Sequence, residues 1–322
     1  MTKTINGNDV TIQDPNNQYN IFQFGPGSTF LNGQIDSSYV YQTGTTNIAF
    51  INGSLDYSRQ YGSNNVLVVS GDYHYGYMSA SGANASNFAS MQGYGNELIT
   101  GTGRTTAYFY GNDGYGQFGG PTTLNVTGNY GSWYGSGTIA ATIQGDGNYV
   151  RDKGGDISIT GNYNSLDEVT TNGARDTIDL STAGVGNSVY WNGDGASKNS
   201  LPDQMNFVSG AGSTDVVFTG GDVTALLTAG SYTRIDATGA DHLTVVTFGN
   251  NVDFNVTAGN VPVNFYNLDT LLANTYSGGK GGAEPVGTSN FSAAGTLTSS
   301  TVNQAAQQYY ASNSSGGEGN MF

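Results

Sequence analysis

Short runs of β-branched and other apolar residues follow one another along most of the chain, and each run is closed by glycine together with serine, asparagine or aspartate. Runs of this length with such closing residues are typical of β-strands bounded by turns. Representative runs are "NVLVVSG" (65–71), "TTLNVTG" (122–128), "DVVFTG" (215–220) and "HLTVVTFG" (242–249). The pattern predicts an all-β fold.

Several runs also end in the same way, with Ser or Thr, then Gly, then Asp or Asn, then Tyr. The three examples are "VVSGDY" (68–73), "NVTGNY" (125–130) and "SITGNY" (158–163). Glycine accounts for 50 of the 322 residues, which suits coils that turn two or three times each. The loose repeat therefore predicts a parallel β-solenoid or β-roll-like stack with a narrow aliphatic core, and a β-sandwich is the alternative.

The end of the chain departs from this pattern. Residues 277–322 lose the strand runs and begin with a linker-like, glycine-rich segment. Within them, residues 301–313 predict a short helix. We therefore expect a β-rich repeat domain over residues 1–276 and a linker with a polar C-terminal tail over residues 277–322.

Charge and cysteine content exclude several classes of partner. Acidic residues outnumber basic ones by 24 to 9, which gives a net charge of −15. Such a charge repels phosphate backbones and anionic lipids, so neither nucleic acid nor a membrane surface is expected as a partner. No apolar run is long enough for a membrane-spanning helix, so no membrane insertion is expected. Cysteine is absent, so disulfides and thiolate metal sites are excluded.

The same acidic charge favours divalent cations, and aspartates in glycine-rich turns suit calcium, which prefers oxygen ligands. The candidate calcium ligands are Asp113, Asp146, Asp152, Asp156, Asp176, Asp194, Asp215 and Asp241. Of these, Asp146, Asp152 and Asp156 are expected to meet at one turn. The alternative is that these residues are ordinary turn formers, since Asp-Gly and Asn-Gly are common in turns.

Residues 57–134 are rich in tyrosine and glycine and contain the second group of candidate site residues. In "DYHYGY" (72–77), the alternation of a strand places the three tyrosines on one face and His74 on the other. The candidates for contact with another copy or with a glycan are Tyr73, Tyr75, Tyr77, Tyr130, Trp133 and Tyr134. Aromatic rings stack on sugars and also form protein interfaces. The alternative is that these rings fill the core or form ladders along stacked strands.

Support for catalysis is poor. The chain contains two histidines, His74 and His242, and no G-x-S-x-G motif. Asp167 and Glu168 are adjacent, so on a strand their side chains point in opposite directions. We therefore predict no catalytic residues and no enzyme activity, and a polysaccharide lyase or hydrolase is the alternative.

The stretches "GARDTIDLSTAG" (173–184) and "TGADHLTVV" (238–246) resemble the calcium-binding nonapeptide G-G-x-G-x-D-x-U-x of the RTX proteins of bacterial type I secretion. In the second stretch Gly239, Asp241 and Leu243 occupy the glycine, aspartate and aliphatic positions. In its glycine-rich composition and repeated strand pattern, the chain is also similar to β-strand-repeat proteins of bacterial S-layers and biofilms. Those proteins carry an uncleaved C-terminal export signal. The terminal residues, with Glu318 before a Met-Phe ending, are similar to that signal.

The resemblance implies a secreted structural protein at the cell surface that forms a layer, filament or biofilm matrix with its own copies, assisted by Ca²⁺. It leaves open an adhesin that binds cell-surface polysaccharide, or a polysaccharide-degrading β-solenoid enzyme. The N-terminal residues lack the apolar segment of a secretory signal peptide. The protein is therefore intracellular, is exported by a leaderless route, or has had its signal peptide removed, and the resemblance implies the leaderless route.

Overall fold

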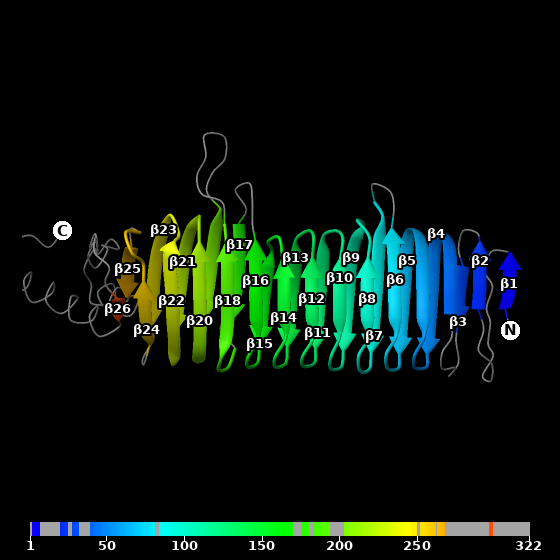
Figure 1. The fold of residues 1–322 in the computed structure, drawn as a ribbon, viewed down its shortest axis with the longest axis horizontal. Coiled ribbons are helices and arrows are strands. Elements are labelled where there is room, and N and C mark those ends of the chain that lie inside the picture. Colours follow the sequence, from blue (N-terminus) through cyan, green and yellow to red (C-terminus); the bar gives the residue numbers. More distant parts are fainter. Residues whose placement is uncertain are drawn as a thin grey trace, which may run out of the picture. The chain divides into compact units, whose positions relative to one another are not determined.

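The computed structural model describes, with side chains, residues 39–80, 84–169, 176–180, 183–193, 203–249, 252–261 and 263–266, and the backbone of strand residues 2–6, 20–24, 28–31, 175, 267 and 296–298. These residues form 26 strands and no helix. No helix in this part of the chain is therefore long and apolar enough to cross a membrane. The chain divides into two compact units, residues 1–157 (unit 1) and 158–322 (unit 2), and the division falls inside β15 (Figure 1).

The strands of unit 1 are numbered in chain order. They are β1 (Thr2–Asn6), β2 (Asn20–Phe24), β3 (Ser28–Leu31), β4 (Tyr39–Asn52), β5 (Tyr57–Ser70), β6 (Tyr75–Ala80), β7 (Ser86–Gln92), β8 (Glu97–Thr100), β9 (Arg104–Tyr110), β10 (Tyr115–Phe118), β11 (Thr122–Thr127), β12 (Ser132–Gly135), β13 (Ile139–Gln144), β14 (Tyr149–Asp152) and the start of β15 (Asp156–Thr160). Every strand pair whose register is described within this unit is parallel.

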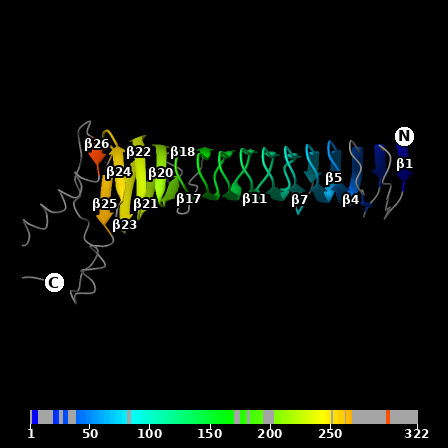
Figure 2. The same cartoon turned by 90° about the horizontal axis from the view of Figure 1, so that it is seen from below.

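Each coil of unit 1 contributes one strand to each of two stacks, which Figure 2 shows as two layers. Stack A contains the first halves of β4 and β5, followed by β6, β8, β10, β12 and β14. Stack B contains the second halves of β4 and β5, followed by β7, β9, β11 and β13. Residues that are register partners on neighbouring coils are 17 to 22 positions apart in the sequence. Unit 1 is therefore a parallel β-solenoid, as the sequence predicts.

The core of unit 1 lies between the two stacks because alternate residues of each strand point inward. Leu67, Met91, Leu98 and Leu124 are among its fully buried side chains, and full burial of a side chain of this size contributes about 1.5–3 kcal/mol. Polar ladders continue the same rows. Asn47 Nδ2 donates to Asn65 Oδ1 over 2.8 Å, and Asn65 Nδ2 donates to Asn87 Oδ1 over 2.9 Å. Because these buried amides are hydrogen-bonded from coil to coil, they fit inside the core.

Glycines make room for the largest core residue of unit 1. Trp133 is 1% exposed and its ring lies against Gly114, Gly116 and Gly131. A Cβ atom added at Gly131 would lie 2.4 Å from Cζ2 of the Trp133 ring, and one at Gly114 would lie 2.7 Å from Cη2. The glycines of "GYGQF" and "GNYGSW" are therefore needed for packing as well as for turning.

Unit 2 repeats this architecture with the rest of β15 and β16 (Ser165–Val169), β17 (Arg175–Leu180), β18 (Asn187–Asn192), β19 (Gln204–Ser209), β20 (Gly212–Thr219), β21 (Asp222–Thr228), β22 (Ser231–Gly239), β23 (His242–Phe248), β24 (Asp253–Thr257), β25 (Val263–Asn267) and β26 (Thr296–Thr298). The even-numbered strands from β16 to β24 form one parallel stack, and the odd-numbered strands from β17 to β25 form the other. Strand β26 pairs antiparallel with β24.

Unit 2 is thus also a parallel β-solenoid, and the alternative of a β-sandwich is not what the chain adopts. Of the predicted tail over residues 277–322, the structure describes only β26. The predicted helix over residues 301–313 lies outside the described residues.

Candidate functional site

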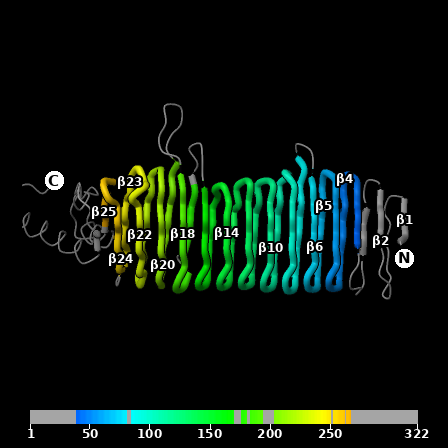
Figure 3. The backbone as a smooth tube through the Cα atoms, viewed as in Figure 1, coloured from blue at the N-terminus to red at the C-terminus, as the bar shows by residue number. Residues whose placement is uncertain are grey.

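A four-residue turn joins each stack B strand of unit 1 to the next stack A strand, and these turns line one edge of the unit (lower edge in Figure 3). The first residue is glycine at each of these turns, and the third has a positive φ angle. The third residues are Leu55 (59°), Tyr73 (55°), Gly95 (64°), Asp113 (55°), Tyr130 (61°) and Gly147 (67°) in unit 1, with Tyr163 (57°) and Gly186 (72°) at equivalent turns of unit 2. The "VVSGDY" pattern of the sequence is therefore the end of a strand followed by this turn.

The second residue of the turn holds successive coils together. The Asp72 carboxylate accepts a hydrogen bond of 2.7 Å from the Tyr94 N–H. The side-chain oxygen of Asn112 accepts one of 2.9 Å from the Asn129 N–H, and that of Asn129 accepts one of 2.7 Å from the Asp146 N–H. Asp and Asn recur in these turns because they bond the backbone of the next coil.

The fourth residue of the turn is buried, and asparagine there bonds the coil before it. Asn96 accepts a hydrogen bond of 2.8 Å from the His74 N–H and donates one of 3.0 Å to the Gly71 carbonyl. Asn148 makes the equivalent pair of bonds further along unit 1. His74 itself occupies a fourth position. Its Nε2 atom lies 3.0 Å from Ser58 Oγ, and burial lowers the pKa of its imidazole to about 3.

Tyrosines at the third position lie on glycines of the next coil. A Cβ atom added at Gly95 would lie 2.7 Å from Cδ1 of Tyr73, and one added at Gly147 would lie 2.7 Å from Cδ1 of Tyr130. The rings of Tyr73 and Tyr130 are nevertheless 55% and 67% exposed. A positive φ angle is costly for a residue as large as tyrosine, and contact with the glycine offsets part of that cost.

The structure places the predicted calcium ligands apart. Asp113 and Asp146 lie in two different turns, Asp152 is buried at the end of β14, and Asp156 is exposed at the start of β15. Asp152 Oδ2 accepts a hydrogen bond of 3.3 Å from the Ile139 N–H. Within the described residues, no three histidine or acidic side chains come together as a metal site. The expected meeting of Asp146, Asp152 and Asp156 at one turn is therefore not found.

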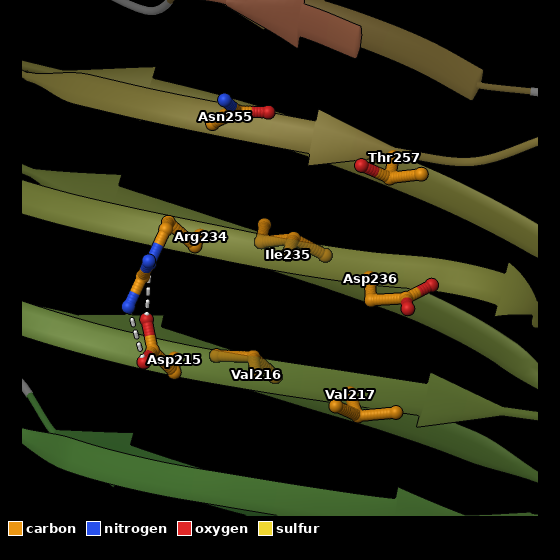
Figure 4. A pocket seen from close by; sticks show the side chains of 8 residues that line it. All are labelled: Asp215, Val216, Val217, Arg234, Ile235, Asp236, Asn255 and Thr257. Carbon is orange, nitrogen blue, oxygen red and sulfur yellow. Dashed lines mark hydrogen bonds and ion pairs between the residues drawn. The ribbon is translucent and has the colours of Figure 1, made fainter. Parts of the chain in front are cut away.

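The other predicted ligands belong to unit 2. Asp176 is buried on β17, Asp215 is exposed on β20, and Asp241 is exposed before β23. Asp194 lies outside the described residues. Asp215 accepts two hydrogen bonds of 2.6 Å from Arg234, beside a hollow of about 320 Å³ on the outer face of the unit (Figure 4). Both side chains are mostly exposed, so this ion pair adds little stability.

The outward positions of stack A in unit 1 carry nine tyrosines, which we call the tyrosine face. They are Tyr39, Tyr41, Tyr57, Tyr61, Tyr75, Tyr77, Tyr115, Tyr134 and Tyr149. The register aligns most of them in two rows. The first row is Tyr39, Tyr57, Tyr75, Glu97, Tyr115, Ser132 and Tyr149. The second row is Tyr41, Arg59, Tyr77, Ile99, Gln117, Tyr134 and Arg151.

The rings of the tyrosine face contact one another from coil to coil. Tyr57 stacks on Tyr39 with ring centroids 4.7 Å apart and on Tyr75 with centroids 4.8 Å apart, and the planes are nearly parallel. Both faces of the Tyr57 ring are therefore covered, and its hydroxyl is hydrogen-bonded to the Arg59 side chain, so only the outer edge of the ring remains for a partner. Partial burial raises the pKa values of Tyr39, Tyr61, Tyr75 and Tyr115, so these four hydroxyls are neutral at physiological pH.

The predicted aromatic residues fall into three places. Tyr75, Tyr77 and Tyr134 belong to the tyrosine face, and His74 is buried at the fourth position of the turn, on the opposite side from Tyr75 and Tyr77. Tyr73 does not share that face, because the turn with its positive φ angle interrupts the alternation before β6; Tyr130 lies at the equivalent turn position. The third place is the core, which contains Trp133, so this residue is not a surface contact.

Sequence reasoning missed most of the tyrosine face, namely Tyr39, Tyr41, Tyr57, Tyr61, Tyr115 and Tyr149. A signal was present in the constant separation of 18 residues between Tyr39, Tyr57 and Tyr75, which places all three at one register position. Comparison with known proteins adds no relative: no family model matches the sequence, and neither a curated protein nor a solved structure matches it.

Proposed function

We propose that this chain is a structural protein whose β-solenoid coils form a scaffold and whose tyrosine face associates with further copies of the chain. The observation that carries the proposal is the face itself, a run of nine partly buried tyrosines over stack A of unit 1. Extended aromatic surfaces of this kind mark contact sites rather than ordinary solvent-facing sheet. Sheet faces pack well against each other at a spacing of about 10 Å.

A glycan-binding adhesin is the second candidate, and the ring geometry favours it less. A sugar ring binds an aromatic side chain through an open ring face. Tyr57 has no open face, because Tyr39 and Tyr75 cover both sides. The hydroxyl edges of the row and the tilted rings of the neighbouring row suit the side chains of another protein surface better.

The proposal is tested with a double variant of the tyrosine face, Tyr57→Thr with Tyr75→Thr, since threonine keeps the β-propensity of both strands. The matched control is Tyr73→Gly with Tyr130→Gly, because glycine occupies the same turn position in Gly95 and Gly147. In sedimentation velocity over a range of concentrations, we expect the wild type and the control to associate and the tyrosine-face variant to sediment as a monomer. A monomeric wild type, or a tyrosine-face variant that associates like the wild type, would contradict the proposal.

Calcium assistance stays a prediction and is part of the proposal, as is secretion. Copies with a net charge of −15 repel one another, and bound divalent cations would reduce that repulsion. We expect calcium chloride at millimolar concentration to increase the sedimentation coefficient more than sodium chloride does at equal ionic strength. Equal effects of the two salts would show that simple screening is sufficient.

A further inference from the structure

The centre of the tyrosine face contains one positive charge. Arg59 on β5 points outward, and its guanidinium carbon lies 5.1 Å from the ring centroid of Tyr57 and 5.9 Å from that of Tyr77. The register surrounds Arg59 with six tyrosines. Tyr41 and Tyr77 lie directly opposite it on the two neighbouring strands, and Tyr57 and Tyr61 lie two residues before and after it on β5. Tyr39 and Tyr75 are its diagonal neighbours. No ion pair of Arg59 occurs among the described residues.

A negative charge lies on the same face, two strands away. Glu97 opens β8 and points outward between Tyr75 on β6 and Tyr115 on β10. Partial burial raises the pKa of Glu97, and no ion pair of this residue occurs in the part of the chain that the structure describes. Each charge is thus partly desolvated among aromatic rings.

Arg59 and Glu97 flank the same strand and do not form an ion pair with each other within one copy. Strand β6 pairs with β5 on one side and with β8 on the other. Neighbouring strands are spaced by about 4.8 Å, so the two backbones are separated by roughly 10 Å. Two opposite charges placed on either side of one strand make the surface complementary to itself.

We propose that two tyrosine faces pack in a two-fold symmetric contact in which Arg59 of each copy pairs with Glu97 of the other. This inference rests on the proposed function and names the partner of that same face. The two-fold axis lies in the plane of the contact and crosses β6 between Tyr75 and Tyr77. In such an isologous contact the pair forms twice. A guanidinium and a carboxylate enclosed by aromatic rings form a strong, directional pair because water is excluded.

The face favours a second copy over an acidic polysaccharide as its occupant. A polyanion would meet Arg59 but would also meet Glu97 and the net charge of −15. A second copy brings one anion for each cation and one aromatic surface for the other. Arg59 is hydrogen-bonded to Tyr57 within its own copy, but neither Arg59 nor Glu97 has an ion-pair partner among the described residues of that copy. Because the contact would bury a charge opposite a like charge in a mismatched pair, a mismatch costs more than the pair itself contributes.

The test uses two single variants. Two copies of the same variant repel each other at the contact, whereas a copy of one variant attracts a copy of the other. In Arg59→Glu, the introduced carboxylate of each copy would face Glu97 of the other; in Glu97→Arg, the introduced guanidinium of each copy would face Arg59 of the other. We expect each variant alone to raise the dissociation constant at least about 100-fold. Mixed in equal amounts, the two variants restore an opposite charge at each contact in the heterodimer, so we expect a 1:1 complex with a dissociation constant within about 10-fold of the wild type. Sedimentation equilibrium measures both quantities, and far-ultraviolet circular dichroism checks that each variant is folded.

The neutral variants Arg59→Gln and Glu97→Gln are a second series that introduces no repulsion; we expect each to weaken association by at least about 10-fold. The pairing is wrong if the mixture of charge-reversed variants associates no better than either variant alone. It is also wrong if all charge variants associate like the wild type. In that second case, loss of association in the variant with Tyr57→Thr and Tyr75→Thr would leave the proposed function intact. A wild type that stays monomeric would end both proposals.

Discussion

Replacing Gly111 by alanine should lower the free energy of unfolding of unit 1 by more than about 3 kcal/mol. Gly111 opens one of the four-residue turns with a φ angle of 144°, and a Cβ atom added to it would lie 2.0 Å from the carbonyl oxygen of Gly93 in the preceding coil. The three nearest atoms are all backbone atoms of Gly93, and the same close approach recurs one coil later, where a Cβ atom at Gly128 would meet the Gly111 carbonyl. No flexible side chain can move aside, so the coils themselves must separate.

The matched control for this prediction is Gly137→Ala in the same unit. A Cβ atom there would lie 3.3 Å from its nearest neighbour, the carbonyl carbon of Gly120, so we expect a cost below about 1 kcal/mol. Urea unfolding followed by circular dichroism gives both values. Equal stabilities of the two variants would mean that successive turns are not in the close contact that the structure gives them.

Acid should destabilise unit 1 through His74. The imidazole has a pKa of about 3 in the folded chain, because it is buried, and its unperturbed value is 6.5. Between these two pH values the unfolded chain binds a proton at this residue and the folded chain does not, so the free energy of unfolding falls as the pH is lowered. The contribution is about 2 kcal/mol at pH 5 and about 4–5 kcal/mol at pH 3, at roughly 1.4 kcal/mol per pH unit.

The variant His74→Asn isolates this effect, because asparagine occupies the same turn position in Asn96 and Asn148. The free energy of unfolding, measured by urea titration at several pH values from about 4.5 to about 7.5, should depend less steeply on pH in the variant, by close to one proton. The wild type and the variant share all their other titrating groups, so the contributions of those groups cancel when the two pH dependences are subtracted. Parallel pH dependences would mean that the imidazole takes up its proton in the folded chain as readily as in the unfolded chain.

The strands and the class of fold could be predicted because both depend on local patterns. The run "TTLNVTG" becomes β11 and its closing glycine becomes the first residue of a turn. The alternation of "DYHYGY" also predicts that His74 lies opposite Tyr75 and Tyr77, as the structure shows, but it does not predict that Tyr73 leaves their face at the turn. Strand alternation in "SWY" (132–134) separates the buried Trp133 from its two outward neighbours. The prediction of a surface contact at Trp133 is wrong because its position in the strand, and not its aromatic character, determines where its ring lies.

The role of the turn residues could not be predicted in the same way, because it depends on pairs about one coil apart. Asp72 and Asn129 read equally well as calcium ligands, as turn formers or as acceptors for the next coil. Only the register between coils distinguishes these roles, because it places the Tyr94 N–H beside Asp72 and the Asp146 N–H beside Asn129. The tyrosine face was missed for the same reason: the coil length changes from 18 to 22, back to 18 and then to 17 residues, and this irregular spacing hides the rows in a short stretch of sequence.

The placement of each turn tyrosine above a glycine limits how the scaffold can be shortened or extended. Removal of the coil that contains Gly95 would bring the Tyr73 ring onto Asp113, and a Cβ atom would then occupy the space that the ring needs. Coils of this chain are therefore not interchangeable modules, and a designer who wishes to change the length of unit 1 should insert or excise each tyrosine coil together with the glycine coil that follows it.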